Sequence, residues 1–522
     1  MLNQPSVEFT RQLWWESLTR RYGGPRALAP RRIMEDLSHL FRVSNYFVAF
    51  INVPLFFSTF YDLNQRDHVQ PSLVLAMLAL STMLQSSDRG LGQTGRLKAL
   101  ELRDLAQSHF DMSLNSGWIT PGLAQAALLM VLFEISCHPT HSESRVRSTL
   151  SLLDSLILAL GLIDLDKEEY SMTTFSPSSV PSRPALFSDH LGQAAIDQAA
   201  TKRGCSCTHF QLSSTSPSSQ KTSPFWVASP GWSEKWNVVE TRREEQRRLV
   251  WSALTVISGH LSYNNSVRRA SQKFDIAKPW NFKVLLPAEK LYGPPQMQDD
   301  FAAKHSIWAL HTRCHMLYTS CLSVHHDESI SEYDKGQFAV QAWLESERIE
   351  RMLNTHTCDL ERPTPFRTLY HLSTADTYHI RTCASRSAFR WVLLMHYCSS
   401  SGDPHFNRDK AMLWLNHQKD IVQHFIPALP RVTGLKDNVL ATRPYFTFWF
   451  HDQLAQYLDI WRQDPTLRIA LDLCVQLLPP VEYLMTLFPS NYPRQRYKVL
   501  HQRLVDACIL AGIPPPSPPS YI

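Results

Sequence analysis

Apolar residues recur three or four positions apart along most of this chain, the spacing of one face of an α-helix. The clearest case begins at Glu244, where the apolar side chains fall within an arc of roughly 160° at 100° per residue, as in a helix packed on a core. These side chains are Leu249, Val250, Ala253, Leu254, Val256, Ile257 and Leu261. Glu244 and Arg248 stand four apart on the opposite face, in the order that favours an ion pair. Arg247 precedes Trp251 by four residues, so we expect its guanidinium to cover the indole ring.

The same period predicts further helices on both sides of this segment. Before it, they lie around Trp14, from Arg32, at 71–86, from Arg96 to about Leu114, from Pro121 and around 150–160. After it, they lie near 301–326, 334–354, 365–399, 409–428, 439–462 and 466–487. No alternating strand pattern separates the early helices. We therefore expect an all-α fold, either one large multi-helical orthogonal bundle or two packed helical halves.

Composition divides the chain into four parts. Ser and Pro crowd residues 171–236, which predicts a flexible insert that is poorly suited to a packed core. A variable surface excursion is favoured there over a phosphorylated regulatory loop. Residues 1–170 and 237–511 are the two helical halves, and residues 512–522 are predicted to be a disordered proline tail.

Charge and cysteine content narrow the class of protein. A chain of 522 residues with 44% hydrophobic content can bury a sizeable core. The formal charge of +5 is mild, and basic residues occur as isolated pairs such as Arg20–Arg21, not in the dense cluster that a DNA-contacting face requires. The ten cysteines are scattered without a C-x-x-C pair, as expected of buried, reduced thiols in an intracellular protein. We expect neither a secretory signal nor a membrane span.

Three short motifs with a chemical interpretation favour structural roles. Gly90–Gly95 matches G-x-G-x-x-G, but a helical segment precedes it and no βαβ unit follows, so we expect a loop between two helices. His311 and His315 are one turn apart without a His-Glu-x-x-His pattern, which favours an ordinary helix surface over a metal site. His138 and His141 lie at a helix end, where polar capping is commonplace.

Searches for reactive groups favour no enzyme class. Cys205 and Cys207 are the one close cysteine pair, and an incidental exposed pair is favoured over a redox site. The sequence contains no G-x-S-x-G elbow, no G-K-[ST] phosphate loop and no paired E-x-x-H ligands. We therefore expect no enzyme, and no catalytic, cofactor-binding or metal-binding residue in this chain.

The segment from Glu244 to Pro287 also carries a family resemblance. It contains E-x-x-R-R-L-x-W on a helix, followed by an irregular stretch that ends in an apolar run and a proline. The matching residues are Glu244, Arg247, Arg248, Leu249 and Trp251, then Asn281 to Pro287, with further likeness at 44–46, 52–57, 71–76 and 148–162. The pattern resembles the fungal-specific transcription factor domain, the middle homology region of binuclear-zinc-cluster regulators, and is closest to basidiomycete members. It departs at Ser258–Gly259–His260, where members usually keep Asp-Arg.

The resemblance implies a regulator of RNA polymerase II transcription in a fungal nucleus. In the family, six cysteines near the N-terminus hold two zinc ions and contact DNA, whereas the first cysteine here is Cys137. We therefore expect the regulatory body alone, without zinc, and DNA contact through a missing or separate module. The implied partners are the transcription machinery or regulatory proteins, with no membrane; a homodimer and a small-molecule effector stay open. A helical enzyme of unrecognised type and a cytoplasmic helical scaffold remain the alternatives.

Overall fold

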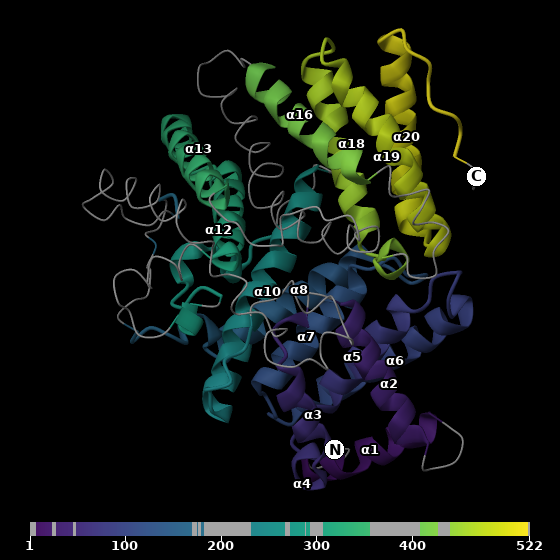
Figure 1. Ribbon diagram of the computed structural model, residues 1–522, viewed down its shortest axis with the longest axis vertical. Helices are drawn as coiled ribbons and strands as arrows, with labels where there is room; N and C mark the ends of the chain where they lie inside the picture. Colours follow the sequence, from purple (N-terminus) through teal and green to yellow (C-terminus); the bar gives the residue numbers. More distant parts are fainter. Residues whose placement is uncertain are drawn as a thin grey trace.

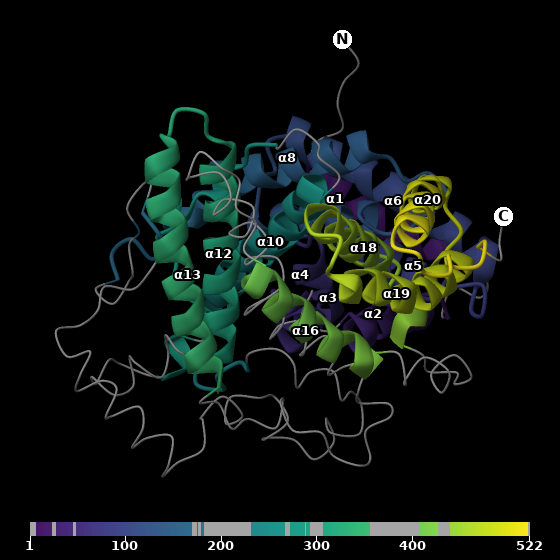
Figure 2. The ribbon, with the colours of Figure 1, turned by 90° about the horizontal axis from the view of Figure 1, so that it is seen from above.

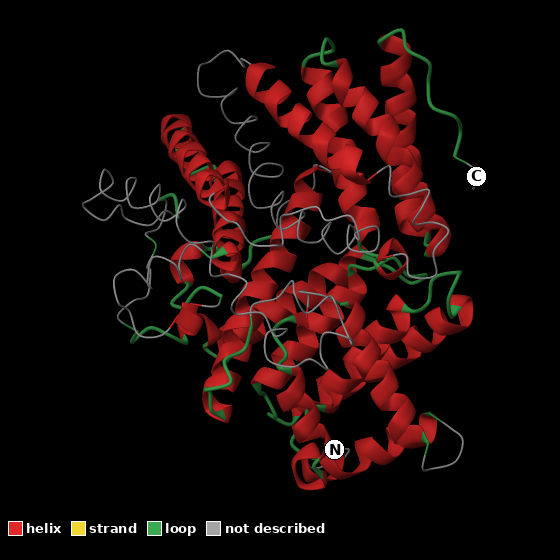
Figure 3. Cartoon of the chain, viewed as in Figure 1, coloured by secondary structure: helices red, strands yellow, loops and turns green. Residues whose placement is uncertain are grey.

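The protein is described here by a computed structural model. It describes residues 7–22, 28–44, 48–169, 175, 179–181, 231–266, 272–287, 289–292, 306–354, 408–425 and 439–519. Every regular element within these ranges is a helix, and they contain no strand (Figure 3). The all-α prediction is confirmed. The predicted helix at 365–399, the Cys205–Cys207 pair and most of the predicted insert at 171–236 lie outside the described residues.

The N-terminal region consists of helices, and one of them, α5, is apolar on every side. They are α1 (Val7–Arg21), α2 (Ala29–Val43), α3 (Val53–Tyr61), α4 (Leu63–Arg66), α5 (Pro71–Leu84), α6 (Gly92–Asn115), α7 (Pro121–Glu134) and α8 (Glu143–Ala159). All residues of α5 are buried, because α2, α6 and α7 pack around it (Figure 1). An apolar surface on every side of a helix requires such central burial.

The glycine motif joins α5 to α6, as predicted. Gly92 begins α6 with a φ of +58°, a left-handed conformation that favours glycine. A Cβ on Gly95 would lie 2.3 Å from Oγ of Ser86, so this glycine allows the loop to approach the helix closely. The motif therefore has a local steric explanation.

The long helix α10 (Val238–Ser266) runs through the middle of the molecule and contacts α7, α8, α12 and α18 (Figure 1). The short 3₁₀ turns η2 (Leu162–Asp164) and η6 (Asp275–Ala277) contact it, and η7 (Pro279–Asn281) contacts η6 and α12. Helices α12 (Ile307–His326) and α13 (Glu332–Asn354) form an antiparallel pair to one side, and α12 packs on α10 (Figure 2).

A second core lies among the C-terminal helices. These are α16 (Arg408–Phe425), α18 (Phe446–Gln463), α19 (Arg468–Leu487) and α20 (Asn491–Leu510), preceded at α18 by η11 (Val439–Thr442). The first core takes in side chains from Trp14 to Ile349, on both sides of the predicted insert, together with Leu487 and Phe488 at the end of α19. The two cores are linked where the Asp88 N–H donates to the Leu487 carbonyl at 3.1 Å.

Two C-terminal features differ from expectation. Helix α19 has the length and composition of a bilayer-crossing segment, which the sequence patterns did not single out. Because α16 and α18 pack on it, it is explained as a core helix. Residues 512–519, predicted to be part of a disordered tail, turn back along α20, where the Ser517 carbonyl lies 3.1 Å from Nε2 of His501.

Candidate functional site

The five residues that carry the family resemblance are all buried. Glu244, Arg247, Arg248, Leu249 and Trp251 are each exposed by less than 5%. The apolar stripe of α10 therefore packs as expected. Glu244 and Arg248, on the opposite face, are buried as well, because segments from distant parts of the chain cover them. The Glu244–Arg248 ion pair does form, with 2.9 Å between Oε1 and Nε, but it is buried.

Arg247 points to Asp166, in the loop after η2, and not to Trp251. Its Nε and Nη2 donate to the two carboxylate oxygens at 2.8 and 2.7 Å, and its Nη1 donates to Glu244 at 3.2 Å. The expected cover of the indole ring is therefore wrong. Burial alone would raise the pKa of the Asp166 carboxyl, but the bonds from Arg247 hold that pKa below its usual value. The carboxylate also accepts the Leu285 N–H at 2.9 Å.

The other two motif residues bind the segments that flank α10. Arg248 donates to the Gly231 carbonyl at 2.5 Å, and its guanidinium carbon lies 3.8 Å from the centre of the Trp232 ring. Trp251 donates from Nε1 to the Leu285 carbonyl at 2.8 Å, and its ring packs on Phe282 at 4.9 Å. The motif thus holds residues 231–232 and 282–285 against one helix.

The upstream segments of the resemblance reach the same unit. Asn52 caps α3 by accepting the Leu55 N–H at 2.9 Å, and its own N–H donates to Glu245 of α10 at 2.8 Å. Asp154 of α8 accepts the N–H groups of Asp275 and Ile276 at 3.0 and 2.9 Å. Segments that are far apart in sequence therefore meet around α10 through buried polar contacts.

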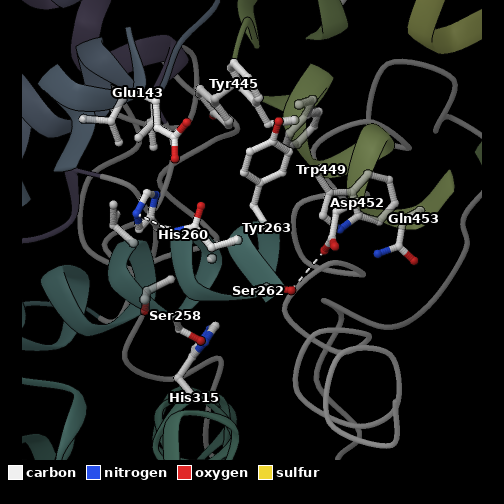
Figure 4. A pocket seen from close by; sticks show the side chains of 18 of the residues that line it. Glu143, Ser258, His260, Ser262, Tyr263, His315, Tyr445, Trp449, Asp452 and Gln453 are labelled. Atoms are coloured by element: carbon white, nitrogen blue, oxygen red, sulfur yellow. Dashed lines mark hydrogen bonds between the residues drawn. The ribbon is translucent and has the colours of Figure 1, made fainter. Parts of the chain in front are cut away.

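Beside this unit lies a cavity of about 200 Å³ (Figure 4). It forms where the α7–α8 link, α10, α12, α18 and the start of α20 meet. Its walls are largely aromatic and include Tyr263, Tyr445, Phe446, Phe448, Trp449 and Tyr492. Tyr263 meets Phe448 edge to face, with ring centres 5.5 Å apart, and Phe448 lies 6.2 Å from Tyr492.

Ser258, Gly259 and His260, where the chain departs from the family pattern, all line this cavity. In Figure 4, Tyr263 rises from α10 toward Trp449, while Ser258 lies with His315 on the other side of the helix. The sequence offered no physical interpretation of this departure. The structure places it at the wall of this cavity.

The prediction of an ordinary helix surface at His311 and His315 is wrong. His311 is buried, and the two Nε2 atoms lie 3.1 Å apart. Nδ1 of His315 is 3.0 Å from the Ser258 hydroxyl. The reason for the error is that α12 packs between α10 and α13, so both of its sides are covered.

The capping role predicted for the second histidine pair is confirmed for His141. Its Nδ1 bonds the Glu134 carbonyl at the end of α7, at 2.8 Å. Burial and the neighbouring His138 lower the pKa of His141 to about 4. The Glu134 carboxylate forms ion pairs with Arg103 and Arg145, and its pKa falls to about 2 although burial opposes this shift.

Cysteine burial agrees with the prediction where it can be seen. Cys137, Cys314, Cys321, Cys474 and Cys508 are buried free thiols. Burial raises the pKa of Cys137 to about 12, which suppresses the reactive thiolate. Among the described residues, no group of three or more His, Cys, Asp or Glu side chains is placed to hold a metal ion.

Comparisons with known proteins add no assignment. A scan against protein-family models, a search of curated proteins and a search of solved structures each found no match to this chain.

Proposed function

We propose that this chain is the regulatory body of a fungal transcription factor, related to the fungal-specific transcription factor domain and controlling RNA polymerase II transcription in the nucleus. DNA contact would come from a zinc-cluster module outside this sequence. The chain itself would act without catalysis, by binding the transcription machinery or regulatory proteins.

One observation carries the proposal. Two of the separate segments that resemble the family meet α10 through buried hydrogen bonds, where Trp251 donates to the Leu285 carbonyl and Glu245 accepts the Asn52 N–H. Arg247 and Arg248 bind Asp166 and Gly231, which lie outside those segments, to the same helix. A pattern with this role supports a shared fold, because Arg247, Arg248 and Trp251 each bind another segment and Glu244 bonds both arginines.

A tethering assay tests the proposal. The full chain, fused to a bacterial DNA-binding domain and expressed in yeast, should change transcription of an operator-driven reporter with intermediate basal activity. An Arg247→Ala fusion should lose this effect, and an Arg31→Ala fusion, altered at an exposed helix pair, should keep it. A well-expressed nuclear fusion that leaves transcription unchanged would contradict the proposal.

Localisation and DNA binding separate the proposal from a cytoplasmic scaffold. Tagged chain should enter the nucleus, and exclusion from it would favour the scaffold. Purified chain should show only weak, salt-sensitive, sequence-independent DNA binding. Tight binding to one sequence at physiological salt would refute the division of labour between this chain and a separate DNA-binding module.

A hydrolase is the second candidate, and one contact favours it. Ser258, His315 and His311 form a hydrogen-bonded chain, the order of nucleophile, base and orienting group, and the first two of them line the cavity. Against it, Ser258 lies inside α10, where the helix uses the neighbouring backbone N–H groups and leaves none to stabilise an oxyanion. A fluorophosphonate probe should therefore leave Ser258 unlabelled; labelling that disappears in Ser258→Ala would favour the hydrolase.

A further inference from the structure

Two buried amide groups at the cavity wall have an unpartnered oxygen. Asn264 of α10 is 3% exposed and Gln453 of α18 is 2% exposed, and both line the cavity. Oδ1 of Asn264 and Oε1 of Gln453 find no hydrogen-bond partner among the residues that the structure describes. A buried acceptor without a donor is destabilising, so such atoms call for an explanation. At a cavity wall, a bound molecule with hydrogen-bond donors supplies one.

The orientation of Asn264 is set by its own helix. Its Nδ2 lies 2.8 Å from Nε2 of His260, one turn earlier on α10. With the amide nitrogen engaged in this way, the oxygen remains as the group offered to the cavity. Gln453 lies on α18, the helix whose Asp452 accepts the Ser262 hydroxyl of α10 at 2.9 Å, and Figure 4 draws it beyond this bond, on the far side from His260.

The remaining walls suit a flat ring. Tyr263, Phe448, Trp449 and Tyr492 line the space between the two helices, and aromatic faces favour stacked or edge-to-face contact with another ring. An apolar cavity of about 150 Å³ takes one benzene ring. The cavity of about 200 Å³ therefore has room for a ring that carries a small polar group.

The charge at the wall selects among such molecules. The described lining includes the carboxylates of Glu143 and Asp452, and it includes no lysine or arginine. Negative charge and acceptor oxygens together disfavour an anion and favour a neutral or positively charged donor. The aromatic faces add attraction for a cation.

We propose that this cavity binds a small planar aromatic molecule bearing amine- or amidine-type N–H donors. Its N–H groups donate to one of the two amide oxygens, Oδ1 of Asn264 or Oε1 of Gln453, and its ring lies among Tyr263, Phe448 and Trp449. The molecule thereby bridges α10 and α18. Binding follows from the cavity alone; its use as an effector rests on the proposed function.

A matched pair of probes tests the ligand class. Benzamidine and benzoate share one ring and a planar substituent, but benzamidine donates and is positively charged, whereas benzoate accepts and is negatively charged. Benzamidine should bind purified full chain in calorimetric titration and raise its Tm, and benzoate should do neither. No binding of benzamidine, or equal binding of both probes, overturns the proposal.

Variants locate the site. Gln453→Leu and Asn264→Leu each remove one of the two candidate acceptors, and the variant that removes the acceptor used should weaken benzamidine binding about tenfold, as expected for loss of a hydrogen bond to a charged group. Gln107→Leu, at a partly exposed position of α6 outside the cavity lining, should leave binding unchanged. Because Gln453→Leu removes an unpartnered buried oxygen, the unliganded variant should keep or raise its Tm, so weaker binding reports the site and not misfolding. Unchanged affinity in both cavity variants overturns the assignment.

The reporter assay keeps the two proposals distinct. If benzamidine binds but the tethered chain has no effect on transcription, the proposed function is contradicted and the proposed ligand site is supported. If the tethered chain changes transcription but benzamidine does not bind, the ligand site is contradicted and the proposed function is supported.

Discussion

The guanidinium of Arg247 and the carboxylate of Asp166 meet through two hydrogen bonds of 2.8 and 2.7 Å, although the residues are 81 positions apart. Both side chains are buried, at 4% and 0% exposed. The planar fork of arginine matches the two carboxylate oxygens, a geometry that lysine cannot reproduce. This pair joins the loop after η2 to α10, so we expect it to contribute strongly to the free energy of unfolding.

Asp166→Asn should therefore destabilise the protein strongly. The substitution leaves the Arg247 charge buried without its main partner, and breaking a buried pair from one side costs about 3–5 kcal/mol. Arg247→Lys should also destabilise the protein, because lysine lacks the two-pronged contact. Urea unfolding at pH 7 measures both effects.

The same chemical change at the surface gives the control. Glu35→Gln breaks an exposed ion pair with Arg31 whose side chains are 63% and 78% exposed. Its effect should stay below about 1 kcal/mol. If Asp166→Asn had no larger effect than Glu35→Gln, the buried pair would not hold the fold together.

His451→Phe should stabilise the protein at neutral pH. His451 is almost fully buried, stacks on Tyr497 at 6.0 Å, and neither ring nitrogen has a hydrogen-bond partner among the described residues. Phenylalanine keeps the ring and removes two unpartnered polar atoms, which should raise the unfolding free energy by about 1–3 kcal/mol. His68→Phe, at an exposed position, should change it little. A destabilised His451→Phe variant would indicate that the imidazole has a partner after all.

Stability should fall as the pH drops from 6.5 toward 4. Burial lowers the pKa of His141 to about 4 and that of His451 to about 3, so the unfolded chain binds these protons first. A folded-state pKa below the unfolded value means that stability is lost as pH falls through this window, by up to ~1.4 kcal/mol per pH unit for each group. Tm measured across the window should decline less steeply in His451→Phe than in the parent protein. An equal decline in both would contradict the assignment.

Sequence patterns anticipated the helices and the packed stripe of α10, because burial of Leu249 and Leu254 follows from helical spacing alone. They did not predict that the opposite face of α10 is also buried at Glu244. Whether Glu244 meets solvent depends on loops that return from 166 and 285, and no local pattern encodes that return. The burial of Gln453 could not be predicted for the same reason. A single amide side chain in a helix is typical of a solvent-exposed position unless the neighbouring helix is known. The long-range contacts are what the structure adds.

Pro479→Ala should stabilise α19. Both Pro479 and Pro480 lie inside this helix, where proline removes a backbone hydrogen bond and strains the preceding turn. Pro479 is exposed, so alanine would restore an N–H facing the Val475 carbonyl without loss of packing. Part of that gain is offset by greater freedom of the unfolded chain, which leaves about 1–2 kcal/mol. Pro480 is buried, so Pro480→Ala also removes packed ring atoms and should gain less. Urea unfolding of the two variants in parallel measures the difference. A larger gain from Pro480→Ala would show that strain at the second proline, not the lost bond at the first, limits the stability of this helix.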